Sequence, residues 1–301
     1  MDMEVNTMSK TSDLVRTTFK KNDDIRDAGL TIPEDVARYV DIIYGPDPDW
    51  QVLDLYRPKD AEGRVLPVIV SVHGGGWVYG DKELYQYYCM SLAQRGFAVI
   101  NYTYRLAPEF QYPASVEDTN LVMTWIMEHA EAYKLDTDHI FAVGDSAGAH
   151  NLAIYTCILT NPDYAASYTF TPPQGLSLKA VAYNCGQYQI DLTAEGEELT
   201  AALMADLLPE RGSPKELNLV SPILHMTADH PPVFVMTAPK DFLRDQASLL
   251  VKKLLELDVP FIFRFYADPA RSLAHVFHCD MRSEYGALCN TEECNFFKEF
   301  L

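Results

Sequence analysis

Strand-like apolar segments alternate with helix-like segments along the chain from about residue 50 onward. The strand-like segments are 51–56, 67–73, 97–102, 139–143, 179–183, 233–237 and 261–265. The helix-like segments between them are 82–95, 115–133, 147–160, 242–257 and 283–300. The run at 67–73 is apolar without alternation, which is typical of a strand buried on both faces. This order predicts an α/β fold in which a mostly parallel central sheet carries helices on both faces.

Two stretches break this order. Residues 1–40 are polar, with apolar residues at helical spacing: Leu14, Val15 and Phe19, then Val36, Tyr39 and Val40. Residues 187–225 contain a helix-like segment at 197–208 and proline-bearing turns but no clear strand. We expect an N-terminal cap segment (1–40) and a main α/β domain (41–301) with a cap insertion at about 187–225. The cap segment and the insertion together would cover the carboxyl ends of the strands, where ligands bind in such sheets. A disordered tail is the alternative for residues 1–40.

Charge and cysteine content narrow the functional classes. The 301 residues include 24 Lys and Arg against 43 Asp and Glu, a net charge of −19. This charge disfavours a nucleic acid or an anionic membrane surface as partner, because both need a basic face. The six cysteines form no CxxC pair and have no histidine at zinc-site spacing, so we expect no metal. The sequence has neither a signal-peptide core nor an apolar run of membrane-spanning length, which predicts a cytoplasmic protein.

The motif Gly-Asp-Ser-Ala-Gly at 144–148 follows the apolar run IFAV and opens a helix-like segment. This is the strand–turn–helix context of a nucleophile elbow, in which glycines leave room for a strained serine and the helix N-terminus points at the reaction centre. The alternative, a serine that caps the helix, is disfavoured by this context. Ser146 is therefore the candidate nucleophile.

The motif His-Gly-Gly-Gly-Trp at 73–77 ends the central strand-like run. Consecutive glycines let backbone N–H groups turn toward a ligand, and each such donor stabilises the oxyanion of a tetrahedral intermediate by roughly 3 kcal/mol. The alternatives are a flexible turn or a phosphate loop, but a Walker loop needs a GK[ST] sequence that is absent here. We expect His73 to support this loop rather than to act as a base.

Three motifs together resemble those of a known family. HGGGW at 73–77, YRLAPE at 104–109 and GDSAG at 144–148 resemble the hormone-sensitive-lipase-like esterases, which include bacterial acetyl esterases. The strings HGGGWVYGDK and SAGAH are also similar to the bacterial carbohydrate and feruloyl esterase branch. The resemblance covers roughly residues 50–280 and implies an α/β-hydrolase fold with a small helical cap. It further implies that the oxyanion is bound by the backbone N–H groups of Gly75, Gly76 and Ala147.

In this fold the acid and then the histidine follow the serine along the chain. The family pattern Asp-Pro-Leu-x-Asp aligns with residues 241–245, so the resemblance assigns the acid to Asp241. Phe242 stands where proline is usual. Asp245 is the alternative acid. The other interpretation of Asp245 is a carboxylate in the first turn of the following helix, where it interacts with the helix dipole.

The base is expected after the last strand-like segment, where the family shows His-Gly-Phe. The resemblance assigns this role to His275, with Val276 at the place of the usual glycine. Because the glycine is replaced, His278 stays open as the alternative base. His150, four residues after the candidate nucleophile, is expected to be structural.

These assignments predict a serine carboxylesterase that hydrolyses short-chain, acetyl-type esters through a Ser-His-Asp triad and an acyl-enzyme, without a cofactor. The expected substrate is a small-molecule ester, with an acylated carbohydrate as one candidate, and a homodimer is one expected assembly. Trp77 and Tyr79, beside the oxyanion loop, either shorten the acyl pocket or pack in the core. The enzymatic alternative is an amidase or arylformamidase with the same triad, and the non-enzymatic one is a catalytically inactive ligand-binding protein of this fold.

Overall fold

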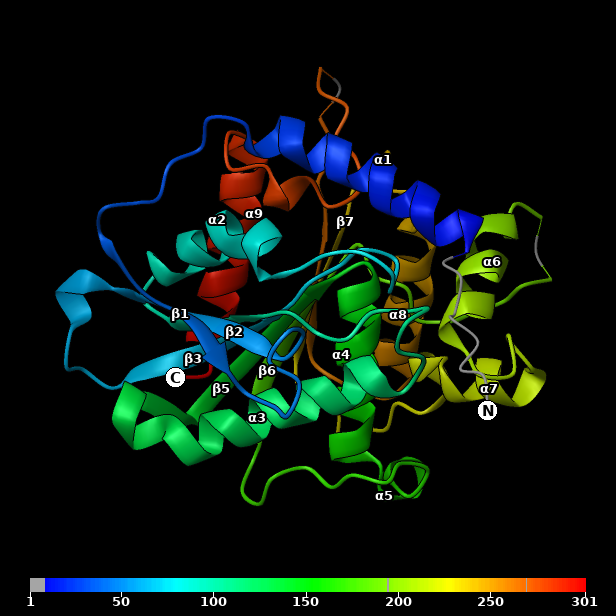
Figure 1. The fold of residues 1–301 in the computed structure, drawn as a ribbon, viewed down its shortest axis with the longest axis horizontal. Coiled ribbons are helices and arrows are strands. Elements are labelled where there is room, and N and C mark those ends of the chain that lie inside the picture. Colours follow the sequence, from blue (N-terminus) through cyan, green and yellow to red (C-terminus); the bar gives the residue numbers. More distant parts are fainter. Residues whose placement is uncertain (1–8, 194, 269) are drawn as a thin grey trace.

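The computed structural model describes residues 9–193, 195–268 and 270–301, and its centre is a sheet of eight strands (Figure 1). The strand order is β1-β2-β4-β3-β5-β6-β7-β8. Strand β2 runs antiparallel to both of its neighbours, and the other neighbouring pairs are parallel. The strands are β1 (Val36–Ile43), β2 (Val52–Pro58), β3 (Leu66–Val72), β4 (Ala98–Tyr102), β5 (Leu135–Asp145), β6 (Leu178–Asn184), β7 (Val233–Thr237) and β8 (Phe261–Phe265). This arrangement confirms the predicted α/β fold with a mostly parallel sheet.

Helices cover both faces of the sheet. Side chains alternate across a strand, so Val68 and Val70 of β3 enter one buried core with α3, α4 and α8, whereas Ile69 enters a second core with α2 and α9. The α-helices are α1 (Lys10–Asp27), α2 (Lys82–Ala93), α3 (Ala114–Tyr133), α4 (Ala147–Thr160), α5 (Pro162–Ala165), α6 (Glu198–Leu207), α7 (Pro214–Leu219), α8 (Arg244–Glu256) and α9 (Glu284–Lys298). Short 3-10 helices are η1 (Lys59–Ala61), η2 (Pro222–Leu224) and η3 (Phe277–Cys279).

The prediction of a helix around Val36, Tyr39 and Val40 is wrong, because these residues lie in edge strand β1. The strand pairs antiparallel with β2, with Val36 opposite Pro58. A short apolar pattern does not distinguish a helix from a strand, and here the free edge of β2 supplies backbone hydrogen-bond partners. Residues 36–40 of the expected cap segment therefore belong to the sheet.

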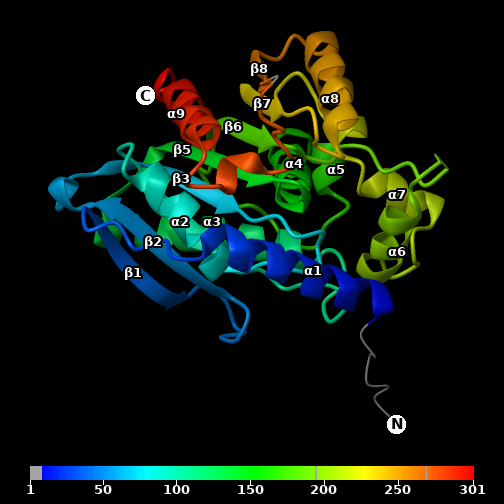
Figure 2. The ribbon, with the colours of Figure 1, turned by 90° about the horizontal axis from the view of Figure 1, so that it is seen from above.

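Helix α1 is predicted correctly by the spacing of Leu14, Val15 and Phe19. Its N-terminal end lies beside α6 in both views (Figures 1 and 2). The hydroxyls of Ser9 and Ser12 donate to the carboxylate of Asp206 on α6. The described residues of the expected insertion at 187–225 form α6, α7 and η2 and no strand, while residues 1–8 of the expected cap segment lie outside the described residues.

All six cysteines lie in described parts of the chain, and each is a buried free thiol. Within the described residues, no helix combines the length and the apolar character needed to cross a membrane.

Candidate active site

Ser146 occupies a sharp turn between β5 and α4. Its backbone has φ 52° and ψ −120°, a conformation that L-residues rarely adopt. The flanking glycines are required by close backbone approach, since a Cβ on Gly144 would lie 2.6 Å from the carbonyl oxygen of Gly148, and one on Gly148 would lie 2.0 Å from that of Val72. The Ser146 N–H donates to the carbonyl oxygen of Asn184 on β6 at 3.0 Å. The turn therefore has the geometry that the Gly-Asp-Ser-Ala-Gly motif predicted.

Asp241 and His275 come from separate loops at the carboxyl ends of β7 and β8 and meet in a short hydrogen bond. His275 Nδ1 lies 2.6 Å from Asp241 Oδ1. The Thr237 hydroxyl donates to Asp241 Oδ2 at 2.6 Å, and the Leu243 N–H donates to Oδ1 at 2.9 Å. Burial alone would raise the pKa of Asp241, but the hydrogen bond and charge of His275, with the bonds from Thr237 and Leu243, hold that pKa below its usual value.

This pairing determines the tautomer of His275. An ionised carboxylate only accepts hydrogen bonds, so Nδ1 of His275 carries the proton that it donates to Asp241. In the neutral form of the ring, Nε2 then has a free lone pair. His275 and Ser146 line the same cavity, which places a proton acceptor and a hydroxyl in one site.

The two alternative residues occupy different surroundings. The Asp245 side chain is exposed and pairs with Arg244 at 3.2 Å. His278 is fully buried, and burial lowers its pKa to about 3, so the ring stays neutral. The structure thus brings together Asp241 and His275 rather than Asp245 or His278.

The predicted oxyanion loop at 73–77 lies beside the pair formed by Asp241 and His275. Gly75 has φ +124°, and a Cβ there would lie 1.9 Å from the carbonyl oxygen of Tyr79. Gly76 also has a positive φ, of 61°. His73 supports the loop from below, with Nδ1 donating to the Gly74 carbonyl at 2.7 Å and its ring stacked on Tyr104 at 4.0 Å. Burial lowers the pKa of His73 to about 4, which keeps it uncharged under the loop.

Trp77 is buried rather than exposed to the cavity of Ser146. Its indole N–H donates to His150 Nδ1 at 3.1 Å, and His150 Nε2 donates to the carbonyl oxygen of Val220 at 2.6 Å. Burial lowers the pKa of His150 to about 4. Trp77 therefore links the oxyanion loop through α4 to the chain after α7, whereas Tyr79 lines the cavity.

The cavity around Ser146 has a volume of about 380 Å³ and joins segments that are far apart in the sequence. Helix α1 contributes a largely polar set, and the loops after β7 and β8 contribute aromatic and apolar side chains. The lining residues are Phe19, Asn22, Asp23, Arg26, Gly74, Gly75, Tyr79, Leu84, Tyr85, Asp145, Ser146, Phe242, His275, Val276, Phe277 and Asp280. The sequence analysis expected residues 1–40 to cover the site, but it did not single out the polar residues of α1, because they form no motif and look like an ordinary solvated helix face.

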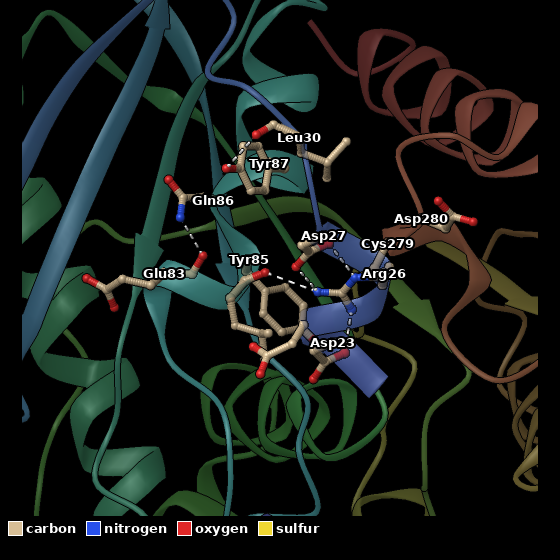
Figure 3. A network of polar contacts seen from close by, with 12 residues as sticks. Asp23, Arg26, Asp27, Leu30, Glu83, Tyr85, Gln86, Tyr87, Cys279 and Asp280 are labelled. Atoms are coloured by element: carbon tan, nitrogen blue, oxygen red, sulfur yellow. Dashed lines mark hydrogen bonds and ion pairs between the residues drawn. The ribbon is translucent and has the colours of Figure 1, made fainter. Parts of the chain in front are cut away.

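Arg26 is the centre of a charged network on α1 (Figure 3). Its guanidinium pairs with Asp23 at 2.8 Å and with Asp27 at 2.7 Å, and it donates to the carbonyl oxygen of Leu84 on α2 at 3.3 Å. Burial alone would lower the pKa of Arg26, but the hydrogen bond with Asp27 and the nearby acidic groups raise it well above its usual value. Arg26 thus remains charged and fastens α1 beside the cavity.

Two buried carboxyl groups lie beneath the site. Burial raises the pKa of Asp145 to about 6, and the Tyr85 hydroxyl donates to this carboxyl at 2.7 Å. Burial raises the pKa of Glu293 to about 7, and this group accepts from Asn184 Nδ2 at 2.7 Å. Because the Asn184 carbonyl also receives the Ser146 N–H, Glu293 supports the nucleophile turn from α9, a role that no sequence signal indicated.

Among the residues that the structure describes, two groups of side chains could each offer three metal-ligand atoms within 4.8 Å of one another. They are Asp145, His278 and Cys279, and Cys185, Asp241 and His275. Burial raises the pKa of both thiols well above its usual value, which disfavours the thiolate form that binds metals. In the second group, the acid and the imidazole already bind each other. We therefore derive no step through a metal.

Comparisons with known proteins agree on the type of fold. Residues 53–254 match the family described as BD-FAE. Esterase LipC of Mycobacterium tuberculosis is 30% identical over 71% of this chain and 54% of its own length, so this chain spans about half of that relative. The ethyl acetate hydrolase of Pseudomonas putida is 38% identical over 31% of this chain and 30% of its own. Among solved structures, esterase B from Lactobacillus rhamnosis aligns with a TM-score of 0.87 and 25% identity over 97% of both chains.

Proposed function

We propose that this chain, which belongs to the BD-FAE family of hormone-sensitive-lipase-like α/β-hydrolases, is a serine carboxylesterase. The observation that carries the proposal is the meeting of Ser146, in its strained turn, with the hydrogen-bonded Asp241–His275 pair in one cavity. A nucleophile, a base and an acid that orients the base are the groups that acyl transfer through a covalent intermediate requires.

The reaction follows from the positions of these groups. Nε2 of His275 accepts the proton of Ser146 as Oγ attacks the ester carbonyl carbon. The resulting oxyanion accepts hydrogen bonds from the N–H groups of Gly75, Gly76 and Ala147. His275 passes its proton to the leaving alkoxide, and an acyl-enzyme remains on Ser146. Water, deprotonated by His275, then attacks the acyl carbon, and His275 returns the proton to Ser146 Oγ as the bond between Oγ and the acyl carbon breaks and the acid leaves.

A covalent probe tests this proposal directly. We expect a fluorophosphonate to label the wild-type chain at Ser146, because the activated Oγ attacks phosphorus as it would attack an ester carbonyl. Mass spectrometry of the labelled peptide identifies the residue. A folded chain that neither reacts with the probe nor hydrolyses p-nitrophenyl acetate would overturn the proposal.

The substrate is proposed to be a small ester with a short acyl chain. A cavity of about 380 Å³ leaves little room for a long chain, and Tyr79 occupies part of its wall. The name of the Pseudomonas relative, an ethyl acetate hydrolase, points to the same substrate class. Asn22, Asp23 and Asp280 offer hydrogen-bond acceptors to hydroxyl groups, which supports acetylated carbohydrates as test substrates.

Acyl-chain length gives a measurable consequence of the small cavity. We expect kcat/KM for p-nitrophenyl esters to peak at about two to four acyl carbons, the range that fits a pocket at the lower end of usual ligand-site volumes. For the dodecanoate ester, kcat/KM should be at least about tenfold lower than at this maximum, which corresponds to a loss of about 1.4 kcal/mol of transition-state stabilisation. A maximum at dodecanoate or longer would contradict this assignment.

We also propose that α1 and α6 form the cap over the site, with β1 belonging to the catalytic domain. Phe19 and Arg26 of α1 line the cavity. Leu203 of α6 lies 3.5 Å from where a Cβ on Gly76 would stand, so α6 reaches the oxyanion loop. A cap of this kind shields the reaction from bulk water and shapes the pocket.

Phe19→Ala tests the cap without cutting the chain. The Phe19 ring packs edge-on against Tyr79, with centroids 6.0 Å apart. Removing it should widen the cavity, raise KM for p-nitrophenyl butyrate by about 3- to 10-fold and flatten the chain-length preference, because apolar contact with the bound ester is lost. Leu14→Ala is the matched control, since Leu14 lies on the same helix and is 65% exposed. If both variants and the wild type have equal KM values, α1 is not part of the cap.

A further inference from the structure

Phe242 is an exposed aromatic side chain that covers the candidate base. It is 68% exposed, yet its ring centroid lies 4.1 Å from that of His275 with an interplanar angle of 38°. The His275 side chain beneath it is only 16% exposed. The bond from the Leu243 N–H to Asp241 fixes the turn that carries Phe242. The ring therefore presents one face to His275 and leaves much of its surface to the cavity that both residues line.

Val276 is the second unusual residue at this place. Its backbone lies in the left-handed region, with φ 51° and ψ 32°, which a β-branched residue rarely adopts. The resembling esterases have glycine here, which would adopt this conformation without strain. Local backbone strain of this kind gathers at functional sites. Val276, like Phe242, lines the cavity.

The reaction chemistry says which part of the substrate meets these two side chains. His275 must give its proton to the leaving oxygen, so that oxygen lies at Nε2 of the imidazole. The alcohol carbon skeleton attached to it then lies next to Phe242 and Val276. Neither side chain carries a charge or a hydrogen-bonding group, and the exposed Phe242 ring can stack on a flat ring. Of the charged residues that line the cavity, Asp23 and Arg26 come from α1, Asp145 precedes Ser146, and Asp280 follows η3.

We propose that Phe242 and Val276 form a leaving-group wall that makes the site select esters of flat aromatic alcohols over esters of puckered alicyclic alcohols that carry no further hydroxyl groups. This inference rests on the proposed esterase function. It assigns a specificity role to two positions at which this chain departs from the family pattern. The wall acts on the alcohol side of the ester and leaves the acyl pocket beside Tyr79 unchanged.

A pair of acetates isolates this selectivity. Phenyl acetate and cyclohexyl acetate share the acyl group, and their alcohols have six-membered rings that differ in flatness. The measured quantity is the ratio of their kcat/KM values, and comparing this ratio between variants cancels the different intrinsic reactivities of the two esters. Phe242→Leu should lower the ratio about 2- to 12-fold, the loss expected when one aromatic stacking contact disappears.

Three further variants complete the test. Phe242→Trp keeps an aromatic face and should retain the wild-type ratio, whereas Val276→Gly should lower the ratio by admitting the puckered ring. Phe265→Leu, at an exposed phenylalanine on β8 that does not line the cavity of Ser146, should leave the ratio unchanged. Because Phe242 is mostly exposed, its replacement should not unfold the protein.

The outcomes separate the wall from the esterase function. The leaving-group wall is wrong if Phe242→Leu leaves the ratio of the two kcat/KM values unchanged, or if Phe265→Leu lowers this ratio equally. The esterase proposal still stands in that case, provided that the enzyme is active and reacts with the probe. If the wild-type chain neither hydrolyses phenyl acetate nor reacts with a fluorophosphonate, the esterase proposal itself is wrong.

Discussion

Ser146→Ala is expected to lower kcat for p-nitrophenyl acetate by about 10⁴- to 10⁶-fold, the range seen when a serine hydrolase loses its nucleophile. The remaining activity would come from the oxyanion loop and from substrate binding. The fold should survive, because alanine keeps the Cβ of serine and meets the same backbone conformation, φ 52°. Steady-state kinetics and thermal unfolding by circular dichroism measure the two effects separately.

A matched control distinguishes the loss of this hydroxyl from the loss of any serine. Ser248 lies on α8, where its exposed hydroxyl donates to the carbonyl oxygen of Asp245 at 2.7 Å. Ser248→Ala should keep wild-type kinetics. If folded Ser146→Ala hydrolyses the ester at a rate near that of the control, Ser146 is not the nucleophile.

Asp241→Asn is expected to lower kcat by roughly 10⁴-fold, because an amide can donate a hydrogen bond to Nδ1 and so stabilises the wrong tautomer of His275. In that tautomer the proton sits on Nε2, which can no longer accept the proton of Ser146. The present geometry depends on an ionised acceptor, and the hydrogen bond from His275 helps hold the pKa of Asp241 below its usual value. KM should change much less than kcat, since the side chain serves the transition state.

Asp245→Asn is the control for this variant, since Asp245 belongs to the same motif but is exposed and paired with Arg244. We expect wild-type kcat and KM for it. The reverse result, with Asp245→Asn inactive and Asp241→Asn active, would move the acid to the second aspartate of the motif.

The sequence by itself determined the local backbone geometry of the two loops that carry the reactive groups. The apolar run before Ser146 and the glycines around it predict a strained turn, because the strand, the turn and the helix are all encoded within about a dozen residues. The same holds for the positive-φ glycines of the loop at 73–77. The pairing of Asp241 with His275 was reached through the order of family motifs, and the structure supplies the 2.6 Å contact between them.

Only the tertiary structure decided which distant side chains share the cavity and which are buried beneath it. Trp77 fitted a pocket or a core equally well in the sequence, and its bond to His150 places it in the core. Val36–Ile43 became a strand because β2 offers a free edge, a fact that its own sequence does not contain. Phe19 reaches the cavity of Ser146 across more than a hundred residues of sequence. Such contacts depend on how whole helices and strands pack. Because the hydrophobic effect is non-directional, a short stretch of sequence does not specify which distant element its apolar side chains will contact.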